Sequence, residues 1–456
     1  MPSLLPSGPA AAVALTLSLA LSGAAGCGSR SDLDPFGAAD SGEQGGGTTT
    51  SGSGTTTPTG STTSGTTGTT TTTVTGPVEC SGLTVLSPLQ VVPTPGEARA
   101  PELQVLPATG EALLAYIEAP PGASGLLRFS ASAAFAEWPP PFSGFPAALE
   151  NVVDFATGPG PEGPVGYIRR AGDLPVLASQ LYPDLVKVDT PFQPGDGEIS
   201  FVAAIPDRYL AAELTAVPGY HVLGVGSYQP GGLPQSEDPL VCTTNRILGA
   251  GVPAGQGFLA AFTQPSYAES CIPAEAGTIA QVGRYDAPPE PGSSLKYTEG
   301  SSWVSAGQPL VHLAMAATSS GAWLAFQTDG STSEVPPPVF AIRLDMAGEP
   351  IPGEQYIPVM PAGFTPPAIA AAAVGDNLAV AWVDNIDPGP PLIALQLVRP
   401  DGSLGPATSF PTSEAWATGR LRLLASPAQN SLLVAWETSL DGHRVALARI
   451  DCIGGL

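Results

Sequence analysis

The chain has 456 residues, of which 43% are hydrophobic and only 12% are charged. Acidic residues outnumber basic ones 40 to 16, and the net charge of −24 repels phosphate backbones and anionic headgroups, which argues against nucleic-acid binding. The 55 glycines and 52 prolines fit many short strands joined by turns, and they fit a helical protein badly because both residues are poor in helix interiors.

The N-terminus carries an apolar run over residues 9–26, which ends in small residues and is followed by Cys27. This run predicts a secretory signal peptide, because glycines shorten its apolar part below the roughly 20 residues that a membrane span requires. Ala24-Ala25-Gly26-Cys27 resembles a bacterial lipobox, although Ala24 stands where Leu is usual and no Lys or Arg precedes the run. The resemblance implies a signal peptide over 1–26 and a lipid on Cys27. Plain secretion and an uncleaved anchor are the alternatives.

Residues 27–79 form the next segment, and from Gly37 to Pro77 it is dominated by Gly, Ser and Thr. Such a composition buries too little apolar surface to offset the entropy of ordering, so we expect a disordered tether. A flexible chain of about 40 residues has a root-mean-square reach of roughly 35 Å. The predicted arrangement is therefore lipid, tether and folded head.

A two-strand unit recurs from Cys80 onward, and its clearest copy runs from Ser431 to Asp451. Its first strand ends in a small residue followed by an aromatic one. The seven positions of this aromatic, with a glutamate in the third copy, are Tyr116, Tyr167, Glu213, Phe262, Phe326, Trp382 and Trp436. Their spacings of 51, 46, 49, 64, 56 and 54 residues are typical of the blades of a β-propeller.

Further apolar segments extend each unit. Ala368–Val374 and Leu421–Ala425 precede the sixth and seventh copies, and Pro406–Pro411 follows the sixth. The 80–456 region resembles the degenerate propeller repeats of exported bacterial lipoproteins, which implies an all-β fold. We expect a single β-propeller of seven four-stranded blades over 80–456. Six or eight blades, or tandem two-sheet sandwiches, remain alternatives.

Three copies share an Arg-apolar-Asp ending: Arg284/Asp286, Arg343/Asp345 and Arg449/Asp451. Alternate residues of a strand share a face, so each pair can form an ion pair at the edge of a sheet. An exposed pair contributes about 0–1 kcal/mol, so we interpret these pairs as structural.

Four cysteines remain after Cys27: Cys80, Cys242, Cys271 and Cys452. An exported chain meets oxidising conditions, and four cysteines allow three connectivities. A circular fold brings its two ends together, with a strand near Leu83–Val92 completing the last blade. Propeller geometry therefore favours Cys80–Cys452 as the closure and Cys242–Cys271 as a local bridge in the fourth unit. No Cys-x-x-Cys is present, so we predict no metal site at these residues.

The chain offers no catalytic motif. Its three histidines are scattered: His221, His443 beside a turn, and His312 on a strand expected to line the axis. The acidic turns Gly195–Glu198 and Asp384–Asp387 carry oxygen ligands that calcium accepts, but such turns are usually only solvated. Neither an Asp box nor a plausible Arg triad of the sialidase kind is found. We therefore nominate no catalytic, cofactor-binding or metal-binding residue.

The sequence predicts a monomeric protein anchored to the bacterial cell envelope by an N-terminal lipid, or alternatively secreted. The leading function is a binding module for a protein or carbohydrate, without a cofactor. A hydrolase or lyase with its site at the axial mouth, and a purely structural envelope component, are the alternatives. An exposed aromatic patch would favour binding, and a cluster of carboxylates with an Arg or His would favour an enzyme.

Overall fold

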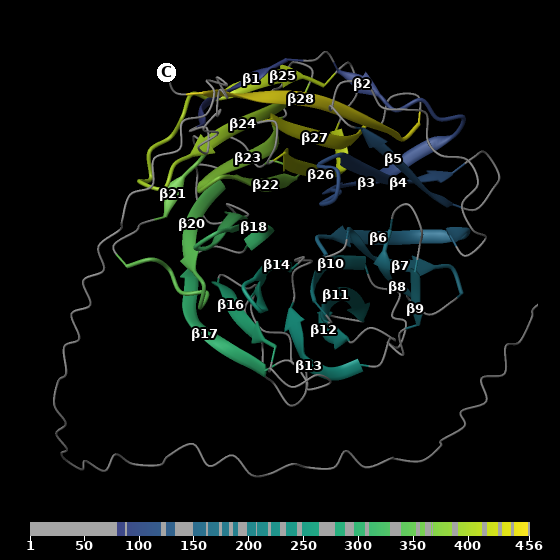
Figure 1. The fold of residues 1–456 in the computed structure, drawn as a ribbon, viewed down its shortest axis with the longest axis vertical. Helices are drawn as coiled ribbons and strands as arrows, with labels where there is room; N and C mark the ends of the chain where they lie inside the picture. Colours follow the sequence, from purple (N-terminus) through teal and green to yellow (C-terminus); the bar gives the residue numbers. More distant parts are fainter. Residues whose placement is uncertain are drawn as a thin grey trace, which may run out of the picture. The chain divides into compact units, whose positions relative to one another are not determined.

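A computed structural model shows the fold of the chain (Figure 1). It describes residues 80–86, 89–119, 125–132, 149–160, 163–172, 176–181, 186–189, 198–206, 208–217, 220–228, 234–243, 249–263, 279–287, 296–305, 310–328, 339–352, 356–360, 366, 368–384, 391–412, 417–426, 431–438 and 442–454. Of residues 186–189, 220–228, 234–243 and 296–305 only the backbone is described. The predicted signal peptide, lipid site and tether lie outside these ranges.

The fold is all-β, and the described strands form seven antiparallel sheets, which we number in chain order. The first sheet contains β3 (Glu97–Val105), β4 (Ala112–Ala119) and β5 (Leu126–Ser132). The second contains β6 (Val152–Gly158), β7 (Val165–Arg170), β8 (Val176–Gln180) and β9 (Val186–Asp189). The third contains β10 (Glu198–Ile205), β11 (Arg208–Val217), β12 (Tyr220–Tyr228) and β13 (Pro234–Thr243). The fourth contains β14 (Ala250–Ala254), β15 (Gly257–Thr263), β16 (Ile279–Asp286) and β17 (Lys296–Ser305).

The fifth and sixth sheets also contain consecutive strands in chain order, whereas the seventh includes strands from both ends of the folded region. The fifth contains β18 (Leu310–Thr318), β19 (Gly321–Thr328), β20 (Val339–Asp345) and β21 (Ile357–Pro358). The sixth contains β22 (Ile369–Val374), β23 (Asn377–Asp384), β24 (Leu392–Val398) and β25 (Thr408–Pro411). The seventh contains β26 (Ala417–Ser426), β27 (Ser431–Thr438) and β28 (Arg444–Gly454), together with β1 (Cys80–Val85) and β2 (Gln90–Val91). No helix in the described part of the chain has the length and hydrophobicity that crossing a bilayer requires.

The predicted period of about 50 residues is confirmed, because each of the seven marker positions lies on the second strand of a sheet. Six of them are aromatic and almost fully buried: Tyr116, Tyr167, Phe262, Phe326, Trp382 and Trp436. Short glycine turns join the strands. Gly375, for example, adopts a φ of 61° in the two-residue turn between β22 and β23, a conformation in which only a residue without Cβ is unstrained. The alternation of apolar strands with such turns therefore specifies the sheets.

The N-terminal strand completes the seventh sheet, as the sequence predicts. β1 pairs with β28, whose other neighbour is β27, so the purple start and the yellow end of the folded chain lie side by side (Figure 1). The single strand expected near Leu83–Val92 is in fact two, and it begins earlier, at Cys80. Pro88 falls between the two strands, and proline has no N–H for the ladder.

Successive sheets contact one another through their first strands. β3 lies against β6, β6 against β10, β10 against β14, β14 against β18, β18 against β22, and β22 against β26. β26 in turn lies against β3 of the first sheet. The approach is close at Gly158 of β6, where a Cβ would overlap the carbonyl oxygen of Val202 in β10. Apolar residues of facing sheets fill the space between neighbours, so the core is distributed over the seams between sheets.

Candidate functional site

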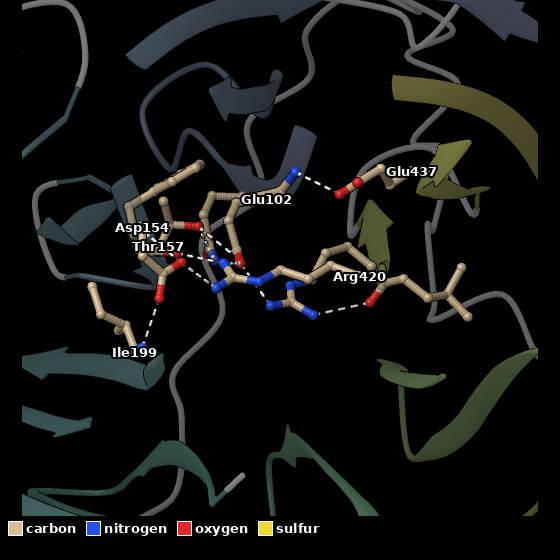
Figure 2. A network of polar contacts seen from close by, with 11 residues as sticks. Glu102, Asp154, Thr157, Ile199, Arg420 and Glu437 are labelled. Atoms are coloured by element: carbon tan, nitrogen blue, oxygen red, sulfur yellow. Dashed lines mark hydrogen bonds and ion pairs between the residues drawn. The ribbon is translucent and has the colours of Figure 1, made fainter. Parts of the chain in front are cut away.

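Two arginines of β26 form the centre of a polar cluster on the first strands (Figure 2). Arg420 forms an ion pair with Asp154 of β6, and one of its amino groups also donates to Glu102 of β3 at 3.3 Å. The same group donates to the carbonyl of Phe155. Arg422, two residues further along β26, donates to Glu102 Oε1 at 2.6 Å. The strand thus presents both guanidinium groups on one face, as alternation requires.

Glu102 is held from a second side. Its Oε2 accepts a hydrogen bond from the Thr157 hydroxyl at 3.5 Å, and that hydroxyl accepts one from the Gln104 amide at 3.1 Å. The Glu102 side chain is only 4% exposed. This carboxylate therefore links the first sheet to both the second and the seventh.

Asp154 links the second sheet to the third. Its Oδ2 accepts the backbone N–H of Ile199 in β10 at 2.7 Å, and its Oδ1 accepts the N–H of Phe155 at 2.9 Å (Figure 2). Its Oδ1 is also the atom that pairs with Arg420. Side chains and backbone groups of four sheets thus meet at one point.

Each of the four strands has an irregular register where it enters the cluster. The shifts lie between Arg99 and Glu102 in β3, Val152 and Asp154 in β6, Ile199 and Phe201 in β10, and Ala417 and Leu421 in β26. A β-bulge bends its strand and redirects the side chains beside it. These bulges therefore turn the charged residues toward one another.

Backbone strain accompanies the bulge in β3. Ala100 has a φ of 53°, a left-handed conformation that is unusual for a residue with a Cβ. Its N–H donates to Glu437 Oε2 of β27 at 3.0 Å, and the other carboxylate oxygen of Glu437 lies 2.5 Å from His443 Nδ1. Glu437 thereby fixes the bulge that directs Glu102 into the cluster.

The cluster is balanced in charge and its acceptors are occupied. Two carboxylates face two guanidinium groups, and all four carboxylate oxygens accept a hydrogen bond. Buried ions of this kind are tolerated because each is paired and hydrogen-bonded. Glu102 and Asp154 therefore connect strands of different sheets through ion pairs and hydrogen bonds. The arrangement joins four sheets.

The sequence did not nominate these residues. The sequence predicts no arginine triad of the sialidase kind, and it gives no sign that Arg420 and Arg422 meet two carboxylates from the start of the folded region. The available signal was the Arg-Leu-Arg alternation in a chain with only 16 basic residues. Their partners could not be inferred, because the bulges change which residues share a face.

The predicted closure is confirmed: Cys80 and Cys452 form a disulfide, with Cα atoms 5.4 Å apart. Cys27 and Cys271 lie outside the described residues. Cys242 lies on β13, so it belongs to the third sheet and not to the fourth, where the sequence interpretation had placed it. The assignment of Cys242 to the fourth unit was wrong because the third sheet has a fourth strand, β13, just before that unit begins. The pairing of Cys242 with Cys271 stays a prediction.

The histidines fall on three different sheets. His312 lies on β18, a first strand as predicted, where burial lowers its pKa to about 4 although it donates a hydrogen bond to the Pro366 carbonyl. His221 lies on β12, and His443 lies at the turn before β28 and contacts Glu437. No two of them meet within the described residues in an arrangement that holds a metal.

Two of the three Arg-apolar-Asp endings form the predicted ion pair. Arg284 bonds Asp286 at 2.5 Å, and Arg449 bonds Asp451 at 2.9 Å. In the third ending, Arg343 donates to the Pro400 carbonyl and lies over the Trp323 ring, while Asp345 accepts two N–H groups of the following turn.

The acidic turns suggested as calcium ligands are only partly described. Of Gly195–Glu198 only the backbone of Glu198 is included, and of Asp384–Asp387 only Asp384. Across the described ranges, no group of three or more His, Cys, Asp or Glu side chains is placed to hold a metal ion.

Comparison with known proteins identifies no family for the chain and finds only distant structural similarity. No protein-family model matches the chain, and no curated protein matches its sequence. Solved structures that resemble it include YCF48 bound to D1 peptide, with 11% identity, a TM-score of 0.42, and 81% of this chain and 97% of that one covered. The phage phi92 endosialidase has 10% identity, a TM-score of 0.43, and coverage of 83% and 70%. The subtype N10 neuraminidase-like protein of A/little yellow-shouldered bat/Guatemala/060/2010 has 10% identity, a TM-score of 0.36, and coverage of 81% and 100%. At this level of similarity no residue role is transferred.

Proposed function

We propose that the chain is a cell-envelope lipoprotein whose folded region is a single seven-bladed propeller that acts as a binding module. The propeller architecture is supported by the contacts of the first strands, which run from β3 through six further sheets and return from β26 to β3. It is also supported by the strand order of the seventh sheet, in which β1 from one end of the folded region pairs with β28 from the other. A crystal structure of the full chain tests the propeller architecture, and a fold made of two separate β-sandwich domains would overturn it.

The observation that carries a binding function over an enzymatic one is that Glu102 and Asp154 are engaged in ion pairs and hydrogen bonds that join four sheets. These are the carboxylates that the first strands bring beside arginines, and their oxygens all accept hydrogen bonds within the protein. A hydrolase that used them would need at least one of them free or readily freed. The cluster instead provides a rigid frame, on which loops at the ends of the strands can present a binding surface.

Direct binding and turnover measurements distinguish the proposed classes. The full chain is immobilised and exposed to defined oligosaccharides and to a library of synthetic peptides, and the recovered probes are analysed by mass spectrometry. A binding module shows saturable binding and returns the probe intact. Cleavage that disappears in Glu102→Gln would establish an enzyme, and the absence of any binding would favour a structural component.

The proposed anchor rests on the lipobox-like Ala24–Cys27 and is tested separately. The full chain is expressed in a bacterium supplied with an alkyne-labelled palmitate, beside the Cys27→Ala variant. A lipoprotein incorporates the label into the membrane fraction, and the variant does not. A labelled variant, or an unlabelled natural chain that is exported to the medium, would contradict the lipid anchor.

A further inference from the structure

An exposed apolar patch lies where β1 passes the sixth sheet, beside β25 (Figure 1). It consists of Leu404 and Pro406, from the loop before β25, and Ile453 of β28. Leu404 is 41% exposed, Ile453 is 48% exposed, and Pro406 is exposed as well. A single exposed apolar side chain is ordinary, whereas several that gather from two sheets mark a surface that another segment can cover.

The patch borders the start of the folded region. A Cβ at Gly82 would meet Pro406 at 3.1 Å and Ile453 at 3.8 Å, so these two side chains flank β1. One residue earlier in the loop, a Cβ would lie 3.5 Å from the carbonyl oxygen of Ser81. The loop therefore follows β1 back toward its first residue, and Leu404 lies on the side from which the chain enters that strand.

Two arginines near the patch are occupied within the protein. Arg399 donates to the Ser81 carbonyl at 2.7 Å and to the Leu404 carbonyl at 3.4 Å. Arg449 forms an ion pair with Asp451 at 2.9 Å. What the patch offers is therefore apolar surface, and the segment that covers it should carry aliphatic side chains.

The chain that enters β1 carries such side chains. Between Gly37 and Glu79, Val74 and Val78 are the only Val, Leu, Ile, Met or aromatic residues. A solvated tether has no need of aliphatic side chains, and both valines stand within six residues of Cys80. Their position next to the folded region, and nowhere else in the tether, indicates that they pack against it.

The length of this segment fits the patch. Val78 and Val74 precede Cys80 by two and six residues, so an extended chain places them up to about 7 Å and 20 Å from it. Alternate residues of an extended chain share a face, so both valines fall on the face of Cys80, with Gly76 between them. Cys80 belongs to the core that the seventh sheet shares with the sixth, and that face is therefore directed toward the sixth sheet.

We propose that residues 74–78 dock on the apolar patch, with the two valines against Leu404, Pro406 and Ile453. The folded head then begins at residue 74, and the Gly, Ser and Thr residues before it form the tether. Docking also fixes the place at which the tether leaves the head, beside the sixth sheet. This inference goes beyond the proposed function and does not depend on it.

Neutrophil elastase, which cleaves after valine and alanine, tests the docking in the full chain. Mass spectrometry follows the new N-termini at residues 75 and 79, and cleavage after Ala39 is the internal reference. The Leu404→Asp, Ile453→Asp double variant is expected to accelerate cleavage after both valines at least tenfold relative to Ala39, because it releases the segment. Leu404→Ser alone, a milder change, is expected to accelerate it at least threefold.

The matched control is the Leu86→Asp, Val91→Asp double variant, which adds the same charge at two exposed apolar residues outside the patch. It is expected to leave the cleavage rates unchanged. Equal rates in the natural chain and in both patch variants would overturn the docking. Protection that disappears on dilution, together with a dimer in sedimentation velocity, would show that a second copy covers the patch instead. Protection that requires phosphatidylcholine vesicles would assign the patch to a bilayer and would likewise overturn the proposal.

Discussion

Arg420 and Asp154 form an ion pair across 266 residues of sequence, and the pair joins the first strand of the last sheet to the first strand of the second. Glu102 belongs to the first sheet and contacts both arginines of β26. The same two ends of the folded region are joined again by the disulfide between Cys80 and Cys452. The seventh sheet is thus tied to the first two by charge and to the N-terminal strand by a covalent bond.

Removing one charge from the cluster is expected to destabilise the protein strongly. Asp154→Asn leaves the buried Arg420 with half of its charge partners, and breaking a buried ion pair lowers the free energy of unfolding by about 3–5 kcal/mol. Urea denaturation, monitored by tryptophan fluorescence, measures the free energy of unfolding of the variant and of the unchanged protein. The matched control is Asp286→Asn, whose 45% exposed carboxylate pairs with Arg284 at the surface and contributes at most about 1 kcal/mol. Equal effects of the two variants would show that the cluster has no special role.

The disulfide is expected to stabilise the closure of the seventh sheet. The Cys80→Ser, Cys452→Ser double variant loses a cross-link between residues 372 apart in sequence, and we expect a loss of about 2–5 kcal/mol in the free energy of unfolding. Peptide mapping without reductant should recover residues 80 and 452 in one linked peptide. A peptide that joins Cys80 to Cys242 would contradict the pairing.

Stability should fall at mildly acidic pH because of His312. Burial lowers its folded pKa from an ordinary 6.5 to about 4, so the unfolded chain binds the proton more readily over this interval. The free energy of unfolding that depends on neutral His312 is fully present above pH 6.5 and is lost as the pH falls toward 4. This loss amounts to about 2 kcal/mol between pH 7.5 and pH 5.

The comparison for this prediction is His312→Gln, which cannot titrate. Other groups, including Asp384 with its raised pKa, titrate in both chains and cancel in the difference between them. Chemical denaturation of both chains at the two pH values gives that difference, and parallel pH profiles would contradict the assignment.

Gly158 should tolerate no side chain. A methyl group there would overlap the Val202 carbonyl, so Gly158→Ala forces β6 and β10 apart and is expected to destabilise the protein by about 2 kcal/mol or more. Gly172→Ala is the control: its Cβ meets no neighbouring atom, and only the positive φ of 78° opposes it, at about 1 kcal/mol. A smaller effect at Gly158 than at Gly172 would show that the first strands are loosely packed.

The sequence predicted the sheets well because each one repeats a local pattern. A marker such as Trp436 is preceded by alternating apolar residues and followed by a turn, and these features act within one hairpin. The closure by Cys80 and Cys452 could also be predicted, since a repeated fold with joined ends leaves those residues adjacent.

The polar sites could not be predicted in the same way. Glu102, Asp154 and Arg420 meet only after bulges in three strands have changed their faces, and a bulge leaves little trace in sequence.

The position of Cys80 has a mechanical consequence. β1 runs antiparallel to β28, with Cys80 at the end where the preceding residues join the folded region. Tension applied through those residues would otherwise peel β1 away one hydrogen bond at a time, beginning at Cys80, which is the weakest way to load a strand. The disulfide passes the load to Cys452 on β28, which is hydrogen-bonded to strands on both sides. The folded head can therefore be pulled by its N-terminal end without unravelling from that end.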